Sequence, residues 1–114
     1  MEWTVTSAVL AVMRAEAAAA HPLECCGLLL GQACAIVQAV PAANVAAEPV
    51  RRFEIDPAAL IAAHRAARGG GLQVLGYYHS HPTGDARPSA TDQAMAAGDG
   101  RVWAILAGCD ICWW

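Results

Sequence analysis

The pattern of apolar residues predicts a strand, a helix and a second strand at the start of the chain. Trp3–Thr6 alternates between apolar and polar side chains, which is typical of a short, half-buried strand. Ser7–Ala20 consists of strong helix formers with its larger apolar residues at helical spacing, and Pro22 ends this helix. The continuous apolar run Cys25–Leu30 predicts a strand that is buried on both faces.

Turn-forming residues separate the elements in the middle of the chain. Gly31–Gln32 predicts a turn into a partner strand over Ala35–Val40, and Pro41–Val50 is expected to be a loop. The segment Asp56–Arg68 predicts a helix, because it begins with an acidic N-cap and a proline in the first turn. Three consecutive glycines follow this segment and end the helix.

The last third of the chain predicts three strands and one short helix. Leu72–His81 is expected to form a strand, and Ser89–Ala97 a short helix. Val102–Ala107 and Cys109–Trp114 predict two final strands. Strands and helices in this order indicate an α/β (α+β) fold, in which helices flank a mixed β-sheet.

Composition narrows the function classes. The hydrophobic share is 57%, much of it alanine, and no apolar run approaches the roughly 20 residues that span a bilayer. The net charge is −3 and every basic residue is arginine, so we expect no basic surface for nucleic acid. Glu2 stands where a signal peptide has basic residues, and the five cysteines indicate reduced thiols rather than a disulfide framework. We therefore expect a cytoplasmic protein without a membrane or nucleic-acid partner.

Two histidines at the end of a predicted strand form the first candidate site. His79 and His81 are two residues apart, so their side chains project from the same face of the strand. Two parallel imidazoles are suitable ligands for zinc. The same pattern fits two exposed histidines at a strand end, and H-x-H alone does not distinguish these alternatives.

Ser89 and Asp92 also allow two interpretations. Ser-x-x-Asp is typical of a capping box, in which Ser89 is the N-cap and Asp92 bonds back to it. However, residues three apart share one helix face, and the loop after His81 is long enough to fold this helix start over the strand end. Asp92 would then be a third ligand beside the histidines and leave the open fourth position of a catalytic zinc site.

A hydrolytic zinc site also needs a group that carries a proton. Zinc lowers the pKa of its bound water toward ~7, and a nearby carboxylate can pass the proton to the leaving group. Glu24 is the candidate, because it directly precedes the apolar run CCGLLL, where a carboxylate is costly without a partner. A solvated glutamate at the entrance of a strand is the simpler alternative.

Together these residues resemble the JAMM metallopeptidase motif of MPN-plus domains, E…H-[ST]-H-P-x6-S-x2-D. The residues that match it are Glu24, His79, Ser80, His81, Pro82, Ser89 and Asp92. The surrounding segments ECCGLLLG, FEIDP and LGYYHSHP are similar as well, so the resemblance covers nearly the whole chain. It implies the MPN/JAMM fold, which resembles the cytidine-deaminase-like architecture, in a single domain over residues 1–114. The family pattern usually continues with a further C-terminal strand.

The resemblance implies a role for each polar residue of the motif. His79, His81 and Asp92 would bind one Zn²⁺ per chain, and Glu24 would act as general base and then as general acid. Ser89 would donate its hydroxyl to the oxyanion of the tetrahedral intermediate. The protein would be a zinc metallopeptidase that hydrolyses a peptide or isopeptide bond.

The short spacing between the glutamate and the histidines resembles the minimal, bacterial-type form of the family. Such proteins are associated with sulfur-carrier proteins of ubiquitin-like fold and with phage tails. The expected partner is the C-terminal tail of a ubiquitin-like or sulfur-carrier protein, docked by β-addition along Asn44–Phe53. A catalytically weak zinc-containing scaffold and a phage-tail-type processing peptidase are the alternatives. Trp113 and Trp114 either pack on the domain or mark a homodimer or partner face.

The cysteines allow two competing interpretations. Cys109 and Cys112 form a C-x2-C pair that, with the two histidines, would make a closed structural zinc site in a binding module. The pair also resembles part of the zinc-deaminase signature, although the glutamate and the proline of that signature are both replaced here. Cys25 and Cys26 have no base beside them, and we expect them to be buried as small apolar residues rather than to act as nucleophiles.

Overall fold

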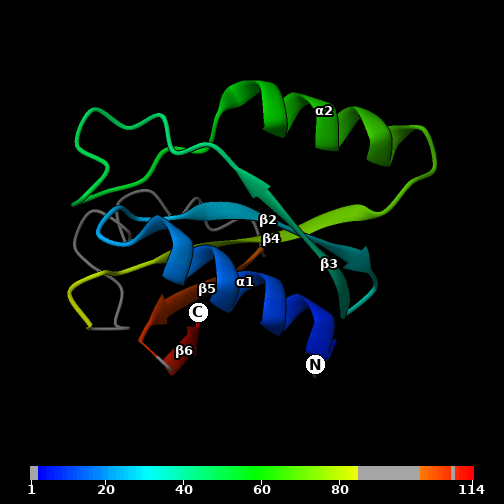
Figure 1. Ribbon diagram of the computed structural model, residues 1–114. Helices are drawn as coiled ribbons and strands as arrows, with labels where there is room; N and C mark the ends of the chain where they lie inside the picture. Colours follow the sequence, from blue (N-terminus) through cyan, green and yellow to red (C-terminus); the bar gives the residue numbers. More distant parts are fainter. Residues whose placement is uncertain (1–2, 85–100, 109) are drawn as a thin grey trace.

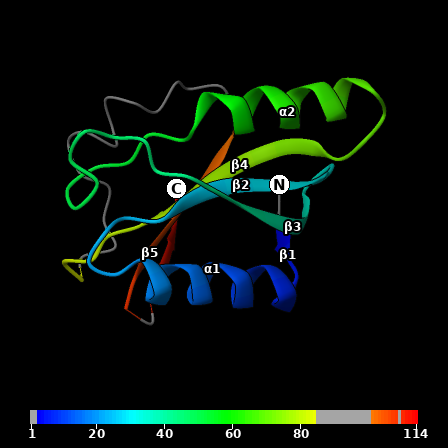
Figure 2. The ribbon, with the colours of Figure 1, turned by 45° about the horizontal axis from the view of Figure 1, so that its top comes forward.

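One mixed β-sheet lies between two helices in the part of the chain that the structure describes. The structure is a computed structural model, and it describes residues 3–84, 101–108 and 110–114. Its elements are β1 (Thr4–Val5), α1 (Ser7–Ala20), β2 (Cys26–Gln32), β3 (Ala35–Ala42), α2 (Pro57–Arg68), β4 (Gln73–Ser80), β5 (Val102–Ala107) and β6 (Asp110–Trp113). Helix α1 covers one face of the sheet and α2 the other (Figures 1 and 2). This arrangement confirms the predicted sheet flanked by helices.

The six strands follow the order β1-β3-β2-β4-β5-β6. The pairs β1–β3 and β4–β5 are parallel, and the pairs β3–β2, β2–β4 and β5–β6 are antiparallel. Strands β2 and β4 therefore occupy the centre of the sheet, although 40 residues of chain (33–72) separate them. The predicted helix Ser89–Ala97 lies outside the described residues.

Both helices begin where the sequence predicts, because a side chain caps each of them. Thr6 Oγ1 accepts a hydrogen bond from the Val9 N–H, and Asp56 Oδ1 accepts one from the Ala58 N–H. The predicted bounds of both helices are confirmed. Neither described helix is long and apolar enough to cross a membrane.

Two strands run further than the sequence predicts. Strand β2 includes Gly31–Gln32, where the predicted turn is wrong, and the chain reverses at Ala33, which adopts a φ of 53°. Strand β3 includes Pro41, where the predicted loop start is wrong. Strand β1 pairs only with Ala35 and Ile36, so Pro41 lies on an edge of the described sheet. An edge tolerates proline because the missing N–H breaks no bond to a further strand.

Alternation along the central strands sends neighbouring side chains to opposite faces and creates two apolar clusters. The cluster against α1 consists of Val9, Met13, Cys25, Leu29, Ile36, Tyr78, Ala104 and Leu106. The cluster on the α2 face consists of Cys26, Phe53, Ile55 and Trp103. Strand β2 is therefore buried from both sides, as its continuous apolar sequence predicts.

The C-terminal tryptophans pack only in part on the sheet. Trp114 exchanges two backbone hydrogen bonds of 2.7 Å with Trp103, and the two rings meet edge to face with centroids 5.7 Å apart. Trp113 and Trp114 still expose 40% and 43% of their surface. Trp114 thus packs on Trp103 with part of its surface.

Candidate metal centre

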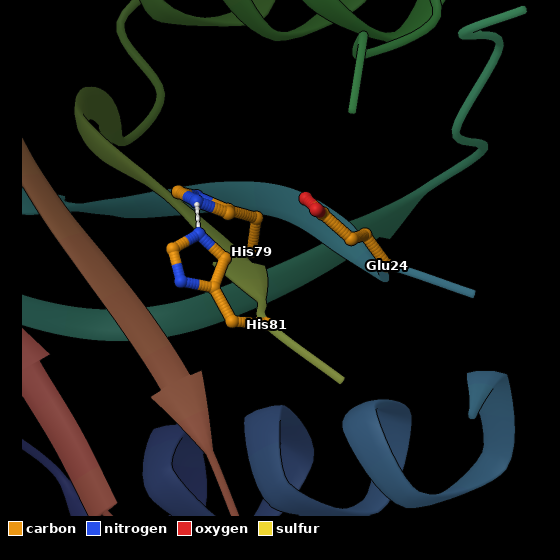
Figure 3. A group of neighbouring side chains, drawn as sticks. All are labelled: Glu24, His79 and His81. Atoms are coloured by element: carbon orange, nitrogen blue, oxygen red, sulfur yellow. Dashed lines mark hydrogen bonds between the residues drawn. The ribbon is translucent and has the colours of Figure 1, made fainter. Parts of the chain in front are cut away.

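Three buried polar side chains meet where the central strands end. His79 lies in β4, His81 directly follows this strand, and Glu24 precedes β2. One ligand atom of each lies within 4.8 Å of the others, and the Nε2 atoms of the two histidines are 3.0 Å apart (Figure 3). Glu24, His79 and His81 expose only 5%, 0% and 9% of their surface. Ser89 and Asp92 lie outside the described residues, so their predicted roles stay predictions.

The register of β2 against β4 explains why the glutamate reaches the histidines. Cys26 pairs with His79 in this antiparallel ladder. In an antiparallel pair, moving back by two residues on one strand corresponds to moving forward by two on the other. Continuing the register places Glu24 opposite His81, on the face toward which His79 projects. The exposed-histidine and solvated-glutamate alternatives are therefore wrong, since all three side chains are buried.

Ser80 joins the two strand ends from the opposite face. Its N–H donates to the Cys25 carbonyl at 3.1 Å, and its Oγ accepts the Cys25 N–H at 2.8 Å. The bond to the hydroxyl is buried, so it fixes the chain next to Glu24 without contributing to the polar cluster. The sequence motif contains Ser80 but implies no separate role for it. The available indication was a hydroxyl in a buried strand, which needs a hydrogen-bond partner.

Aromatic rings hold the His79 imidazole in one orientation. Phe53 stacks on it with centroids 4.2 Å apart and an interplanar angle of 18°. Trp103 meets it edge to face at 5.7 Å and 88°. These contacts leave the ring little freedom to rotate, which suits a metal ligand because its nitrogen stays aimed at one point. The sequence indicated neither ring as a support of His79, because both reach it only through the fold.

The donor set fits a zinc ion. Two nitrogens that share a tetrahedral zinc at about 2.0–2.1 Å lie about 3.3 Å from each other. The 3.0 Å between the Nε2 atoms of His79 and His81 is close to that separation. Glu24 adds a carboxylate oxygen within 4.8 Å, which is near enough to act on a group held by the two imidazoles. Imidazole nitrogen and carboxylate oxygen are both ligand types that zinc accepts.

The alternative zinc site with Cys112 does not fit the strand arrangement. Cys112 pairs with Ile105 of β5, and Ile105 pairs with His79 of β4. Among the described residues, the ligand atoms close enough to share an ion belong to Glu24, His79 and His81, and Cys112 is not part of this group. Cys109 lies outside the described residues.

The paired cysteines at the start of β2 behave as predicted. Cys25 and Cys26 are both buried. Burial raises the pKa of the Cys25 thiol, and burial raises the pKa of the Cys26 thiol to about 12. Both thiols are therefore protonated at neutral pH, which excludes them as ready nucleophiles.

A cavity of about 380 Å³ lies beside the polar cluster. It is lined by Glu24, Val50, Arg51, His81, Pro82 and Thr83. Val50 and Arg51 belong to the loop between β3 and α2, which contains Asn44–Phe53, the docking region expected from the sequence. This loop therefore borders the cavity, whereas docking itself stays a prediction.

The buried cluster can be set beside known proteins at this point. Residues 6–114 match the family described as prokaryotic homologs of the JAB domain. The chain belongs to this family. The predicted membership of the JAMM (MPN-plus) group is confirmed by this match, which covers nearly all of the chain.

Three relatives show how the family differs in length. A desampylase from Haloferax volcanii is 40% identical over 101 residues, which is 87% of this chain and 73% of the relative. The "Probable TtuB-protein conjugate cleaving protease" of Thermus thermophilus is 39% identical over 71 residues, or 62% of this chain and 47% of the relative. Tail tip assembly protein K of Escherichia phage N15 is 33% identical over 93 residues, which is 82% of this chain and 36% of the relative. This chain thus spans less than half of the last two.

Solved structures confirm the predicted fold. The solution structure of a protein from Desulfitobacterium hafniense matches this chain with a TM-score of 0.81 and 30% identity. The match covers 98% of this chain and 81% of that protein's chain. A crystal structure of a JAB1/MPN domain protein from Archaeoglobus fulgidus matches 92% of this chain and 74% of its own, with a TM-score of 0.61 and 22% identity. The chain therefore adopts the JAB1/MPN fold.

Proposed function

We propose that this protein is a zinc-dependent peptidase or isopeptidase, which cleaves the amide bond at the C-terminal tail of a ubiquitin-like or sulfur-carrier protein. The buried cluster of Glu24, His79 and His81 carries this proposal, because it combines two imidazoles with a carboxylate beside a cavity. The names of two relatives, a desampylase and a conjugate-cleaving protease, support deconjugation as the reaction. Residues 1–114 would act as one domain.

In this proposal His79, His81 and Asp92 hold one Zn²⁺ per chain. Bound zinc lowers the pKa of water and polarises a carbonyl group. The protein supplies the orientation of the ligands, since Phe53 and Trp103 pack on His79. Asp92 is assigned from the sequence motif.

Glu24 is proposed to carry the proton. Its carboxylate is buried and borders the cavity that the scissile amide would enter. It would accept a proton from the attacking water and deliver it to the amine nitrogen as the C–N bond breaks. The Ser89 hydroxyl would donate a hydrogen bond to the oxyanion, a role that also rests on the sequence motif.

The loop between β3 and α2 is proposed to bind the extended tail of the substrate. Val50 and Arg51 of this loop line the cavity together with Glu24. A tail that ends in small residues such as Gly-Gly would reach the polar cluster along this rim, with its backbone bonded to Asn44–Phe53.

Zinc content and cleavage, measured on the same preparations, test these roles. We expect wild type to hold one zinc per chain and to cleave a ubiquitin-like protein joined through its diglycine tail to a lysine side chain. Glu24→Gln should keep the zinc and lose about 100- to 10,000-fold in kcat, because the proton carrier is gone. Asp92→Asn should lose the zinc. Glu16→Gln, on α1, is the matched control and should behave as wild type.

Two outcomes would contradict the proposal in different ways. If Glu24→Gln loses zinc while Asp92→Asn retains it, the roles of these two carboxylates are exchanged. If zinc-loaded wild type leaves both isopeptide-linked and linear fusions intact, the protein is not a deconjugating enzyme. A zinc-containing scaffold would then be indicated if the protein still binds the ubiquitin-like partner.

The similarity to tail tip assembly protein K supports one second candidate, a phage-tail-type processing peptidase. The same assay separates the two functions when a phage tail-tip protein replaces the conjugate. Cleavage of that protein, without cleavage of ubiquitin-like conjugates, would favour the second candidate.

A further inference from the structure

The side chain of Asn44 uses its full hydrogen-bonding capacity within the loop between β3 and α2. Its Nδ2 donates to the carbonyls of Glu24 and Arg52 at 3.0 and 3.1 Å. Its Oδ1 accepts the N–H groups of Ala46 and Glu54, each at 3.0 Å. An amide side chain has two N–H donors and two acceptor sites, and all of them are occupied here. Asn44 thus joins both sides of the loop to the residue proposed as the proton carrier.

The backbone of Glu24 is held by this loop on both sides of its side chain. Its N–H donates to the Pro49 carbonyl at 2.8 Å, and its carbonyl accepts from Asn44. Glu24 lies two residues before β2, beyond the paired part of the sheet. The direction of its side chain follows from its backbone conformation, which depends on these loop contacts.

The same loop also reaches the other parts of the cluster. Phe53, near its end, stacks on the His79 ring. Val50 and Arg51 form the rim of the cavity that Glu24 borders. One loop therefore contacts the proposed proton carrier, a proposed ligand and the proposed entry of the substrate.

We infer that Asn44 is a positioning residue that holds this loop, so that Glu24 and the rim face the same cavity. The inference rests on the proposed function, because it concerns the reaction in which Glu24 carries a proton. A displacement of about 1 Å of a reacting group can lower a rate about 100-fold, so a loosened Glu24 would slow proton transfer strongly. His79 also packs against Trp103 of β5, which lies outside this loop. The His81 N–H donates to the Leu106 carbonyl of β5 at 2.7 Å, so both imidazoles keep a support when the loop loosens and should retain the metal.

Amide hydrogen exchange tests the contact without any activity assay. In Asn44→Ala we expect the exchange protection of the Glu24 and Glu54 amides to fall at least about tenfold, because their loop partners loosen. The amides of Leu28 and Leu29 in the centre of β2 should be unchanged. Gln73→Ala is the matched control, since it removes an amide that makes one exposed hydrogen bond of 3.4 Å to the Ala67 carbonyl.

Kinetics normalised to bound zinc test the positioning role. Asn44→Ala should lower kcat about 10- to 100-fold, with unchanged zinc per chain, at a temperature where the variant is folded. Asn44→Asp keeps the two acceptor sites but replaces the donor to the Glu24 carbonyl with an oxygen, and it should lose kcat at least as much. It also provides the test if Asn44→Ala fails to fold. Gln73→Ala should retain the wild-type kcat.

The inference is overturned if the Glu24 amide stays protected in Asn44→Ala, or if Asn44→Asp keeps the wild-type kcat. A loss of zinc in parallel with activity would also contradict it, because Asn44 would then act on the ligands. Failure of the proposed function has a different signature: zinc-loaded wild type would not cleave the conjugate, while the exchange experiment would still decide whether Asn44 holds Glu24.

Discussion

The two faces of β4 share one backbone and differ in chemistry. On the α1 face, Tyr78 belongs to an apolar cluster, and the Ser80 hydroxyl is used by a backbone N–H. On the α2 face, His79 packs against Phe53 and Trp103 and meets a second imidazole. Along β4, residues on the α1 face therefore contribute to stability, and those on the α2 face to the proposed chemistry. This separation allows neighbouring substitutions to be compared at nearly the same place in the sheet.

The largest contrast is expected between Tyr78→Ala and His79→Gln. Tyr78 is fully buried in the cluster against α1, so Tyr78→Ala should lower the free energy of unfolding by about 3–5 kcal/mol. His79→Gln should abolish zinc binding and activity, yet lower the stability of the metal-free protein by less than half as much. Urea denaturation with a chelator, beside zinc analysis, measures both. Equal losses of stability would mean that the two faces are not functionally separate.

Phe53 offers a smaller contrast within the α2 face. Phe53→Leu removes the ring stacked on His79 and should weaken zinc binding about tenfold, as loss of an outer support of a ligand does. Phe53→Tyr keeps the ring and should bind zinc nearly as wild type does. Competition with a chromophoric chelator measures the affinities. If both variants bind zinc equally, stacking does not orient the imidazole.

Removing either of two hydroxyls on the α1 face should change the free energy of unfolding, but in opposite directions. The Tyr78 hydroxyl is buried without a hydrogen-bond partner among the described residues, so Tyr78→Phe should raise the free energy of unfolding by about 1 kcal/mol. Ser80→Ala removes the acceptor of the Cys25 N–H and should lower it by about 1–2 kcal/mol. Urea denaturation decides between them, and a destabilised Tyr78→Phe would indicate an additional polar contact at that hydroxyl.

The smallest effect concerns the pH dependence of stability through Cys26, which lies on the α2 face. Burial raises its pKa from 9.0 to about 12, so the unfolded state releases this proton first as pH rises. The buried thiol therefore contributes its full stabilisation below pH 9, and this contribution falls as pH rises above 9. Between pH 8 and 9.5 the free energy of unfolding should fall by less than about 1 kcal/mol from this source. Cys26→Ser should reduce this loss in urea titrations at the two pH values. If the free energy of unfolding falls equally with pH in wild type and Cys26→Ser, the buried thiol is not the source of the pH dependence.

Local features of the sequence predicted the two described helices well. Asp56 directly precedes the helix that it caps, so its effect is visible without the fold. Thr6, which caps α1, was expected only as the end of the first strand. Strand ends were predicted less well. Gly31 and Pro41 are usual turn residues, yet pairing between β2 and β3 keeps both in strands. Pairing depends on a partner strand, which the local composition does not reveal.

The sequence by itself determined that His79 and His81 project together, because alternation along a strand is a local property. It also singled out Glu24 as a carboxylate next to a buried strand, and Ser89 and Asp92 as further candidates. Only the tertiary structure decided that Glu24 comes to His81, since the register of β2 against β4 joins segments far apart in the chain. The same holds for Asn44 and Phe53, whose contacts with the cluster depend on how the loop returns to the sheet.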